Sequence, residues 1–195
     1  MDSGELSSAC NSTTTAQQLN ASTNERMKHP PAFIGNSNNI HVIIETPRGT
    51  GSKYVYDTEL DLFKLKKVLP AGIVFPYHFG FIPNTYAEDG GPLDVLVLMD
   101  EPAYPGCLIE CRLVGVIEIE ESKYGKRIRN DRFLAAAIET QNFDKHQTIT
   151  DFSAHKLKEI INFLSAYTAF TTKNIKHLGN RGSKAALENV RRHLV

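Results

Sequence analysis

Residues 86–102 read YAEDGGPLDVLVLMDEP, an acidic turn followed at once by an apolar run. Asp89 precedes a Gly-Gly-Pro turn, and Asp94 lies between Leu93 and Val95 at the start of the run. Aspartate is common in turns for local hydrogen-bonding reasons, which suffices to explain Asp89 alone. A carboxylate beside a buried strand costs free energy unless it is paired or binds a cation. The two aspartates are therefore candidates for holding one oxygen-liganded ion such as Mg²⁺.

Short runs rich in Val, Ile, Leu and Tyr lie on both sides of this stretch, from residue 40 onward. Turn signals at residues 47–49 and 104–106 separate them. Many short strands at close spacing predict a β barrel or sandwich. After Thr150 the apolar residues recur every three or four positions, which predicts a helix, and a second helix is expected over Ser183 to Leu194. The expected fold is mainly β, with a barrel followed by two packed helices.

Length and composition favour one folded domain. The 195 residues are 41% hydrophobic, enough for a single core. Residues 1–28 are mostly Ser, Thr, Asn, Gln and Ala, so we expect a disordered tail and a folded domain over residues 29–195. The N-terminus resembles neither a signal peptide nor a transit peptide, and no apolar run approaches the roughly 18 residues of a membrane span. The three cysteines lack CxxC spacing. A cytoplasmic protein without a membrane partner is expected.

Basic residues stand at the ends of expected strands. Lys53 follows a Gly-Ser turn, Lys66 and Lys67 end an apolar run, and Arg132 opens another. Lysine at a strand edge often serves only to block aggregation. Acids and bases together at strand ends of one small barrel nevertheless resemble a metal–phosphate site, in which cations bridge anionic oxygens and Lys or Arg neutralises the remainder.

Four segments together resemble the soluble family I inorganic pyrophosphatases: VFPYHFGFIPNT, EDGGPLDVLVL, PGCLIECRLVGVIE and NDRFLA. The resemblance extends from about Ile40 to about Ala137 and more loosely through the C-terminal helices. It implies a five-stranded OB-like β-barrel with helices packed on it. It also implies magnesium-dependent hydrolysis of pyrophosphate to two phosphates, usually by a cytoplasmic homo-oligomer.

The resemblance further implies roles for individual residues. Active-site carboxylates are implied at Glu45, in IIETP, and at Asp89 and Asp94, which also match metal ligands of the family. Asp131 and Glu121 are further candidate metal ligands. The implied substrate-binding side chains are Lys53, Lys67, Arg132 and Tyr167.

The chain departs from the family pattern at several positions. Gly91 stands in place of the middle aspartate, which in the family bridges metals and helps to orient the attacking water. Asn130 aligns with another metal aspartate, and a shift of one residue would bring in Asp131 instead. Loss of one bridging carboxylate predicts a rate penalty of at least roughly 10²–10³. Further departures from family side chains are Val55, Phe75, Phe79, Lys67 and Thr168.

Three hypotheses for function follow. The first is a magnesium-dependent inorganic pyrophosphatase, slowed by Gly91. The second is a paralogue without turnover that binds phosphate compounds or partners with active subunits. The third, an OB-type oligonucleotide binder, is disfavoured because Lys plus Arg and Asp plus Glu both number 22 and no obvious row of stacking aromatic residues is present. Pyrophosphate or phosphate is thus the expected ligand, and nucleic acid is not.

Overall fold

The structure is a computed structural model that describes residues 29–195 except 124, 144 and 170–173. The predicted disordered tail, residues 1–28, lies outside this described part. The elements follow in the order β1 (Asn39–Thr46), β2 (Ser52–Asp57), β3 (Leu62–Val68), β4 (His78–Ile82), β5 (Leu93–Leu98), β6 (Leu108–Lys123), β7 (Lys126–Arg129), β8 (Arg132–Ala137), the short 3-10 helix η2 (Ile149–Asp151), α1 (Ala154–Ala169), β9 (Asn174–Gly182) and α2 (Ser183–Arg192).

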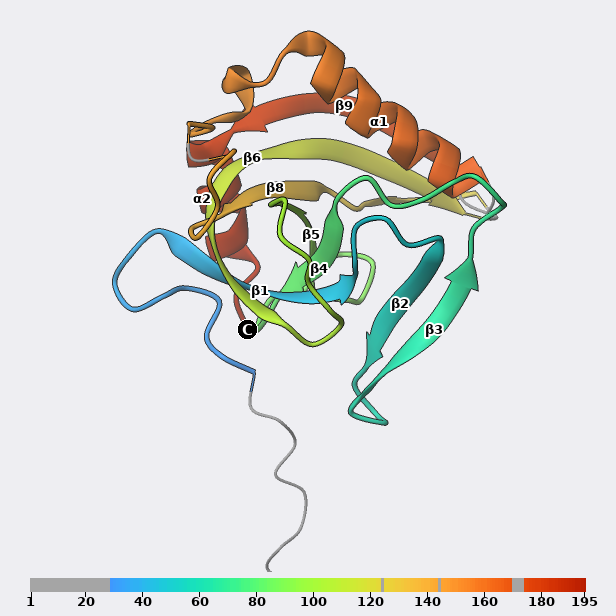
Figure 1. The fold of residues 1–195 in the computed structure, drawn as a ribbon, viewed down its shortest axis with the longest axis horizontal. Coiled ribbons are helices and arrows are strands. Elements are labelled where there is room, and N and C mark those ends of the chain that lie inside the picture. The colour runs from blue at the N-terminus through green and yellow to red at the C-terminus, as the bar shows by residue number, and fades with distance from the viewer. Residues whose placement is uncertain (1–28, 124, 144, 170–173) are drawn as a thin grey trace, which may run out of the picture.

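Five of these strands close into a barrel (Figure 1). The order is β1-β4-β5-β8-β6, and β1 also pairs with β6, so the sheet returns to its first strand. The pair β5–β8 is parallel, whereas the other pairs of the ring are antiparallel. The prediction of a five-stranded OB-like barrel with C-terminal helices is confirmed. Within the described residues, no helix is both long and apolar enough to cross a membrane.

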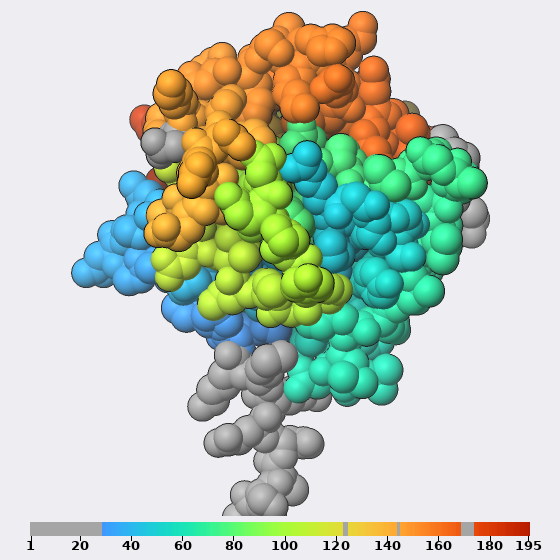
Figure 2. Space-filling view, in the orientation of Figure 1, coloured from blue at the N-terminus to red at the C-terminus, as the bar shows by residue number. Residues whose placement is uncertain are grey.

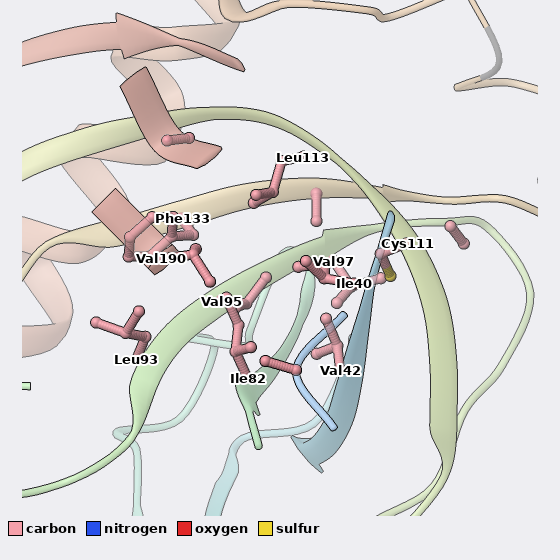
Figure 3. Packing of buried hydrophobic residues seen from close by; sticks show 14 of the residues in the cluster. Ile40, Val42, Ile82, Leu93, Val95, Val97, Cys111, Leu113, Phe133 and Val190 are labelled. Atoms are coloured by element: carbon pink, nitrogen blue, oxygen red, sulfur yellow. The ribbon is translucent and has the colours of Figure 1, made fainter. Parts of the chain in front are cut away.

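Side chains that alternate along the barrel strands pack into two different hydrophobic cores, one inside the barrel and one outside it. On β5, Val95 and Val97 pack inside the barrel, whereas Leu96 and Leu98 pack outside it, against α1. Figure 3 shows Val95 and Val97 facing the same interior as Val190 of α2. Because both faces of β5 are buried, the strand reads as a continuous apolar run instead of an alternating one.

The C-terminal region differs from the prediction in two respects. A strand that was not predicted, β9, follows α1 and precedes α2 in the chain, and it pairs with β6 along eight residues of each strand. Its sequence, NIKHLGNRG, is polar and mostly exposed, so it lacks the apolar alternation that identifies a strand. The helix α2 begins at Ser183 as predicted and ends at Arg192 instead of Leu194.

The strands β2 and β3 form a hairpin outside the barrel sheet (Figure 1). Its aromatic residues anchor it, since the Tyr56 ring lies 5.3 Å from Phe63 and 6.0 Å from Phe81 of β4. The opposite face of the hairpin carries Lys53 and Val55. The hairpin thus holds a charged wall beside the outer surface of the barrel.

Candidate active site

A polar cavity of about 860 Å³ lies between the hairpin and the outer face of the barrel. Its lining comes from the hairpin, the acidic turn before β5, the end of β6, the start of β8 and the end of α1. Figure 2 shows the hairpin and α1 on the same face of the molecule. The cationic lining residues are Lys53, Lys64, Lys66, Lys67 and Arg132, and the acidic ones are Glu45, Asp57, Glu59, Asp89, Asp94 and Glu121.

Strand register brings acid and base together at the floor of the cavity. Val95 of β5 pairs with Phe133 of β8, and both face the barrel interior. Asp94 and Arg132 each precede one of these residues, so they face outward side by side. Arg132 Nη1 lies 2.7 Å from Asp94 Oδ2, and its Nη2 lies 3.1 Å from Glu121 Oε1. Glu121, on β6, is 3% exposed at its side chain, so this ion pair supplies a partner for an almost buried carboxylate.

The acidic turn places Asp89 at the same cavity. Its Oδ2 accepts a hydrogen bond of 2.9 Å from Asn130 Nδ2, and its Oδ1 accepts one of 3.3 Å from the Gly91 amide. Gly91 lines the cavity as well. A Cβ atom added at Gly91 would meet Asp89 Oδ1 at 3.8 Å, an ordinary contact, and the backbone there is not left-handed. Local sterics therefore do not require glycine at this position.

Glu45 extends from the end of β1 into the cavity. Its Oε1 accepts a 2.8 Å hydrogen bond from the Tyr56 amide of the hairpin. Burial raises the pKa of the Glu45 carboxyl to about 7, although the Tyr56 hydrogen bond opposes the shift, and Asp94 adds to it. Glu45 can consequently hold or release a proton near neutral pH.

Two lysines of the hairpin face Tyr167, near the end of α1. The Nζ atoms of Lys53 and Lys67 lie 5.2 Å and 5.8 Å from the centre of the Tyr167 ring, so both contacts are cation–π. Burial by itself would lower the pKa of Lys53, but Tyr167 and Asp94 together raise it above the usual lysine value. Lys53 therefore stays charged across the physiological range and can bind an anion.

The family model of inorganic pyrophosphatase matches residues 42–194. The chain belongs to the inorganic pyrophosphatase family. The inorganic pyrophosphatase of Thermus thermophilus is 42% identical over 155 residues, which are 78% of this chain and 86% of that protein. The Synechocystis protein of the same name is 36% identical over 148 residues, 76% of this chain and 85% of its own.

Solved structures of the pyrophosphatase family agree with the fold. The crystal structure of the Thermus thermophilus enzyme gives a TM-score of 0.77 at 39% identity, covering 85% of this chain and 95% of that one. The structure of an inorganic pyrophosphatase from Coxiella burnetii gives a TM-score of 0.75 at 31% identity, covering 84% of this chain and 97% of that one. The family resemblance that four sequence segments indicated is thereby confirmed.

One residue that the pyrophosphatase resemblance suggested lies away from the cavity. Asp131 does not line it, because Asn130 and Arg132 on either side both face it and successive side chains alternate. The Asp131 carboxylate instead pairs with Arg129 at 3.0 Å and accepts a 2.9 Å hydrogen bond from the Ile119 amide. In this arrangement the Asp131 carboxylate is not directed into the cavity beside Asn130.

The structure shows where the other residues that depart from the family pattern lie and what they contact. Val55 lines the cavity. Phe75 and Phe79 are buried, with ring centres 5.5 Å and 6.1 Å from Phe163 of α1, so they pack and offer no donor to the site. The Thr168 hydroxyl donates back to the main chain of α1 at 3.0 Å. Of these four residues only Val55 and Thr168 line the cavity, so Phe75 and Phe79 support it from the core.

Lys64 also lines the cavity, although the sequence analysis did not single it out, and so does Lys66, which it named only among the basic residues at strand ends. They lie two residues apart on β3, and side chains at that spacing share a face of a strand. The alternation in LFKLKKV was only a partial signal for them, because Lys67, next to Lys66, lines the cavity too where the β2–β3 register shifts.

The residues of the cavity fit a metal ion at one position and not at another. Asp89 and Asp94 both present carboxylate oxygens, the ligands that hard divalent cations take, to the cavity. Between Asp94 and Glu121, by contrast, the Arg132 guanidinium already lies at ion-pair distance from both carboxylates. Across the described part of the chain, no three His, Cys, Asp or Glu side chains form a group that could hold a metal.

Proposed function

We propose that this protein hydrolyses inorganic pyrophosphate to two phosphates with Mg²⁺ as cofactor. The observation that carries the proposal is the meeting, in one cavity, of Lys53, Lys67 and Tyr167 on one wall with Asp89 and Asp94 on another. A small, highly charged anion needs cations on both of its phosphoryl groups, and acids that hold metal ions complement lysines that bind directly. Membership of the pyrophosphatase family supports the same reaction.

The chain's own residues would divide the work as follows. Lys53 and Lys67 would neutralise the phosphate oxygens, and the Tyr167 hydroxyl would donate a hydrogen bond to one of them. Arg132 would add positive charge from the floor of the cavity. Lys67 keeps a charge where the family carries arginine, but an ammonium lacks the bidentate fork.

The acids would serve the cofactor and the proton balance. Asp89 and Asp94 would hold Mg²⁺, which when bound supplies positive charge for the phosphoryl oxygens and lowers the pKa of water. Glu45, with its raised pKa, would exchange a proton at its carboxylate near neutral pH. Phosphoryl transfer depends mainly on positioning and electrostatics, so a site that retains these groups can still work slowly.

The comparisons favour hydrolysis over a subunit that binds without turnover, because the relatives named above are pyrophosphatases. The family also supports a homo-oligomer located in the cytoplasm, which we propose as its assembly and location. The equal numbers of acidic and basic residues argue against nucleic acid as a partner.

Release of phosphate from pyrophosphate by the full chain, with Mg²⁺ and then with EDTA, tests the proposal. We expect turnover that requires the metal and falls at least tenfold in Lys53→Met, because this variant loses a charge-assisted contact. The matched control is Lys176→Met on the exposed strand β9, which should retain the wild-type rate. Saturable binding of imidodiphosphate without any phosphate release would instead support the binding subunit. Single-stranded DNA binding that weakens steeply with salt would support the oligonucleotide binder.

A further inference from the structure

The connection between β4 and β5 carries the acidic turn, and one buried hydroxyl joins its two ends. The Thr85 hydroxyl donates a hydrogen bond of 2.6 Å to the carbonyl of Ile82, the last residue of β4. It accepts one of 3.0 Å from the amide of Leu93, the first residue of β5. Thr85 is 6% exposed, so loss of its hydroxyl would leave these buried groups without this partner. A single side chain therefore sets how the two ends of the connection meet.

The segment between these ends is folded on itself. The Ala87 amide donates to the Gly91 carbonyl at 2.7 Å, and the Gly90 amide donates to the Ala87 carbonyl at 3.1 Å. Ala87 is buried with the residues of the barrel interior, which anchors the turn to the core. The Asp89 carboxylate is held by the Gly91 amide and by Asn130 Nδ2, at 3.3 Å and 2.9 Å. The carboxylate thus belongs to a compact hydrogen-bonded unit, and the buried hydroxyl joins the ends of the connection that carries it.

Residues 193–195, which follow α2, hold the incoming side of the connection from outside. They run antiparallel to it. The Tyr86 amide donates a hydrogen bond of 2.8 Å to the His193 carbonyl, and the Val195 amide donates one of 3.1 Å to the Asn84 carbonyl. The backbone on both sides of the buried threonine is therefore fixed by main-chain pairing, which leaves its hydroxyl in place to close the turn.

The two candidate metal ligands depend on this connection to different degrees. Asp94 lies on β5 and pairs with Phe81 of β4, so the barrel fixes its backbone. Asp89 lies outside the strands, so its position relative to Asp94 is set by the conformation of the turn. A site that is already formed binds its ligand more tightly than one that the ligand has to order, because the apparent affinity falls with the populated fraction of the competent state.

We propose that Thr85 is a positioning residue for the proposed metal site: its hydroxyl holds the acidic turn in the conformation that directs Asp89 and Asp94 at the same ion before that ion binds. Thr85 does not line the cavity, so it acts through the turn and not by contact with metal or substrate. The inference rests on the proposed function in taking the two aspartates as Mg²⁺ ligands. The order of the turn in the absence of metal does not depend on that function.

The first test needs no substitution. Amide hydrogen exchange of the wild type, followed by NMR in EDTA, measures the order of the turn without metal or substrate. We expect the Ala87 and Gly90 amides to exchange at least about tenfold more slowly than in an unstructured peptide, because both donate hydrogen bonds within the closed turn. Amides that gain protection only when Mg²⁺ is added would show that the metal orders the turn, and would overturn the proposal.

The second test removes the hydroxyl. Thr85→Val keeps the shape of the side chain, Thr85→Ser keeps the hydroxyl, and Thr140→Val is the matched control. Thr140 is also buried, does not line the cavity, and its hydroxyl has no hydrogen-bond partner within the described residues. Calorimetric titration of each metal-free protein with Mg²⁺ should give a dissociation constant about tenfold higher for Thr85→Val than for the wild type, and within about twofold for the other two variants.

Two readouts separate positioning from a general loss of stability. In Thr85→Val the Ala87 and Gly90 amides should lose protection in EDTA, while the amide of Leu96, fully buried on β5, keeps it. Phosphate release should require about tenfold more Mg²⁺ for half of the maximal rate, while the maximal rate falls less than about threefold, because the bound ion then orders the turn. A folded Thr85→Val variant with the wild-type dissociation constant for Mg²⁺ would overturn the proposal.

The outcomes also separate this proposal from the reaction. Mg²⁺ binding that weakens in Thr85→Val, without phosphate release from pyrophosphate by the wild type, would reject hydrolysis and leave the role of Thr85 standing. Magnesium-dependent phosphate release by the wild type, with the same Mg²⁺ dissociation constant in Thr85→Val, would reject the role of Thr85 alone.

Discussion

Gly91 is the position at which one substitution tests the proposed metal site most directly, because it lines the cavity beside Asp89 and carries no side chain. Gly91→Asp restores the acid of the family pattern. The new Cβ would meet Asp89 Oδ1 at 3.8 Å, and the backbone at Gly91 is not left-handed, so the variant should fold without strain.

The magnitude follows from charge. Without metal, the new carboxylate would lie about 4–5 Å from Asp89, which is exposed, and repulsion across water costs about 1 kcal/mol. For a chain of this size that lowers the melting temperature by about 2–4 °C in EDTA. A metal bound at 100 times its dissociation constant stabilises the fold by about 2.7 kcal/mol, so Mg²⁺ should more than reverse the loss. A restored ligand should raise the hydrolysis rate at least tenfold, within the roughly 10²–10³ that one electrostatic group contributes.

The assay pairs phosphate release with thermal melting, each in EDTA and across a Mg²⁺ series. Gly91→Asn is the control, since it adds nearly the same volume without charge, and it should show neither the loss in EDTA nor the gain with Mg²⁺. The reasoning is refuted if Gly91→Asp melts at the same temperature as Gly91→Asn in both conditions, because the new carboxylate would then face neither Asp89 nor a metal. A normal melting response without a faster reaction would show that the other replacements also limit the rate.

Three further predictions concern the acid, the tyrosine and the core. The pKa of Glu45 is about 7 in the folded protein and 4.5 for an unperturbed glutamate, so between these pH values the folded state binds a proton that the unfolded state has released. The contribution of this proton to the free energy of unfolding is fully present below pH 4.5 and has declined by about 3 kcal/mol once the pH rises past 7. Denaturant unfolding in EDTA at pH 5 and pH 8 should show this decline in the wild type and not in Glu45→Gln. An equal change in the free energy of unfolding in both proteins would contradict the burial argument. Tyr167→Phe keeps the ring that contacts Lys53 but loses the hydroxyl, so steady-state kinetics should show KM rising about five- to tenfold with little change in melting temperature; an unchanged KM would exclude a contact with substrate. Gly80→Ala should be destabilised by roughly 3 kcal/mol or more, because its Cβ would lie 2.2 Å from the Ile43 carbonyl oxygen, and a variant with wild-type denaturant stability would show that β1 and β4 can separate there at little cost.

The barrel could be predicted from the sequence because its strands are short, apolar and bounded by turn residues, and α1 because its apolar residues recur at helical spacing. The strand β9 could not be predicted, since it is polar and is held by backbone pairing to β6, which leaves no pattern in the side chains. The roles of Lys64 and Lys66 could be predicted only in part. Their spacing shows that they share a face, but only the position of the hairpin shows that this face lines a cavity.

The sequence by itself determined which chemical groups are present: the acidic turn with Asp89 and Asp94, a glycine between them at position 91, and the alternation that sends side chains to opposite faces of each strand. The tertiary structure decided which groups meet. Arg132 contacts carboxylates from two other strands, while Asp131, its immediate neighbour, pairs with Arg129 on the other side of the sheet. The reason is that alternation along a strand is local, whereas the register between strands, which decides what faces each side chain, is set only when the whole barrel closes.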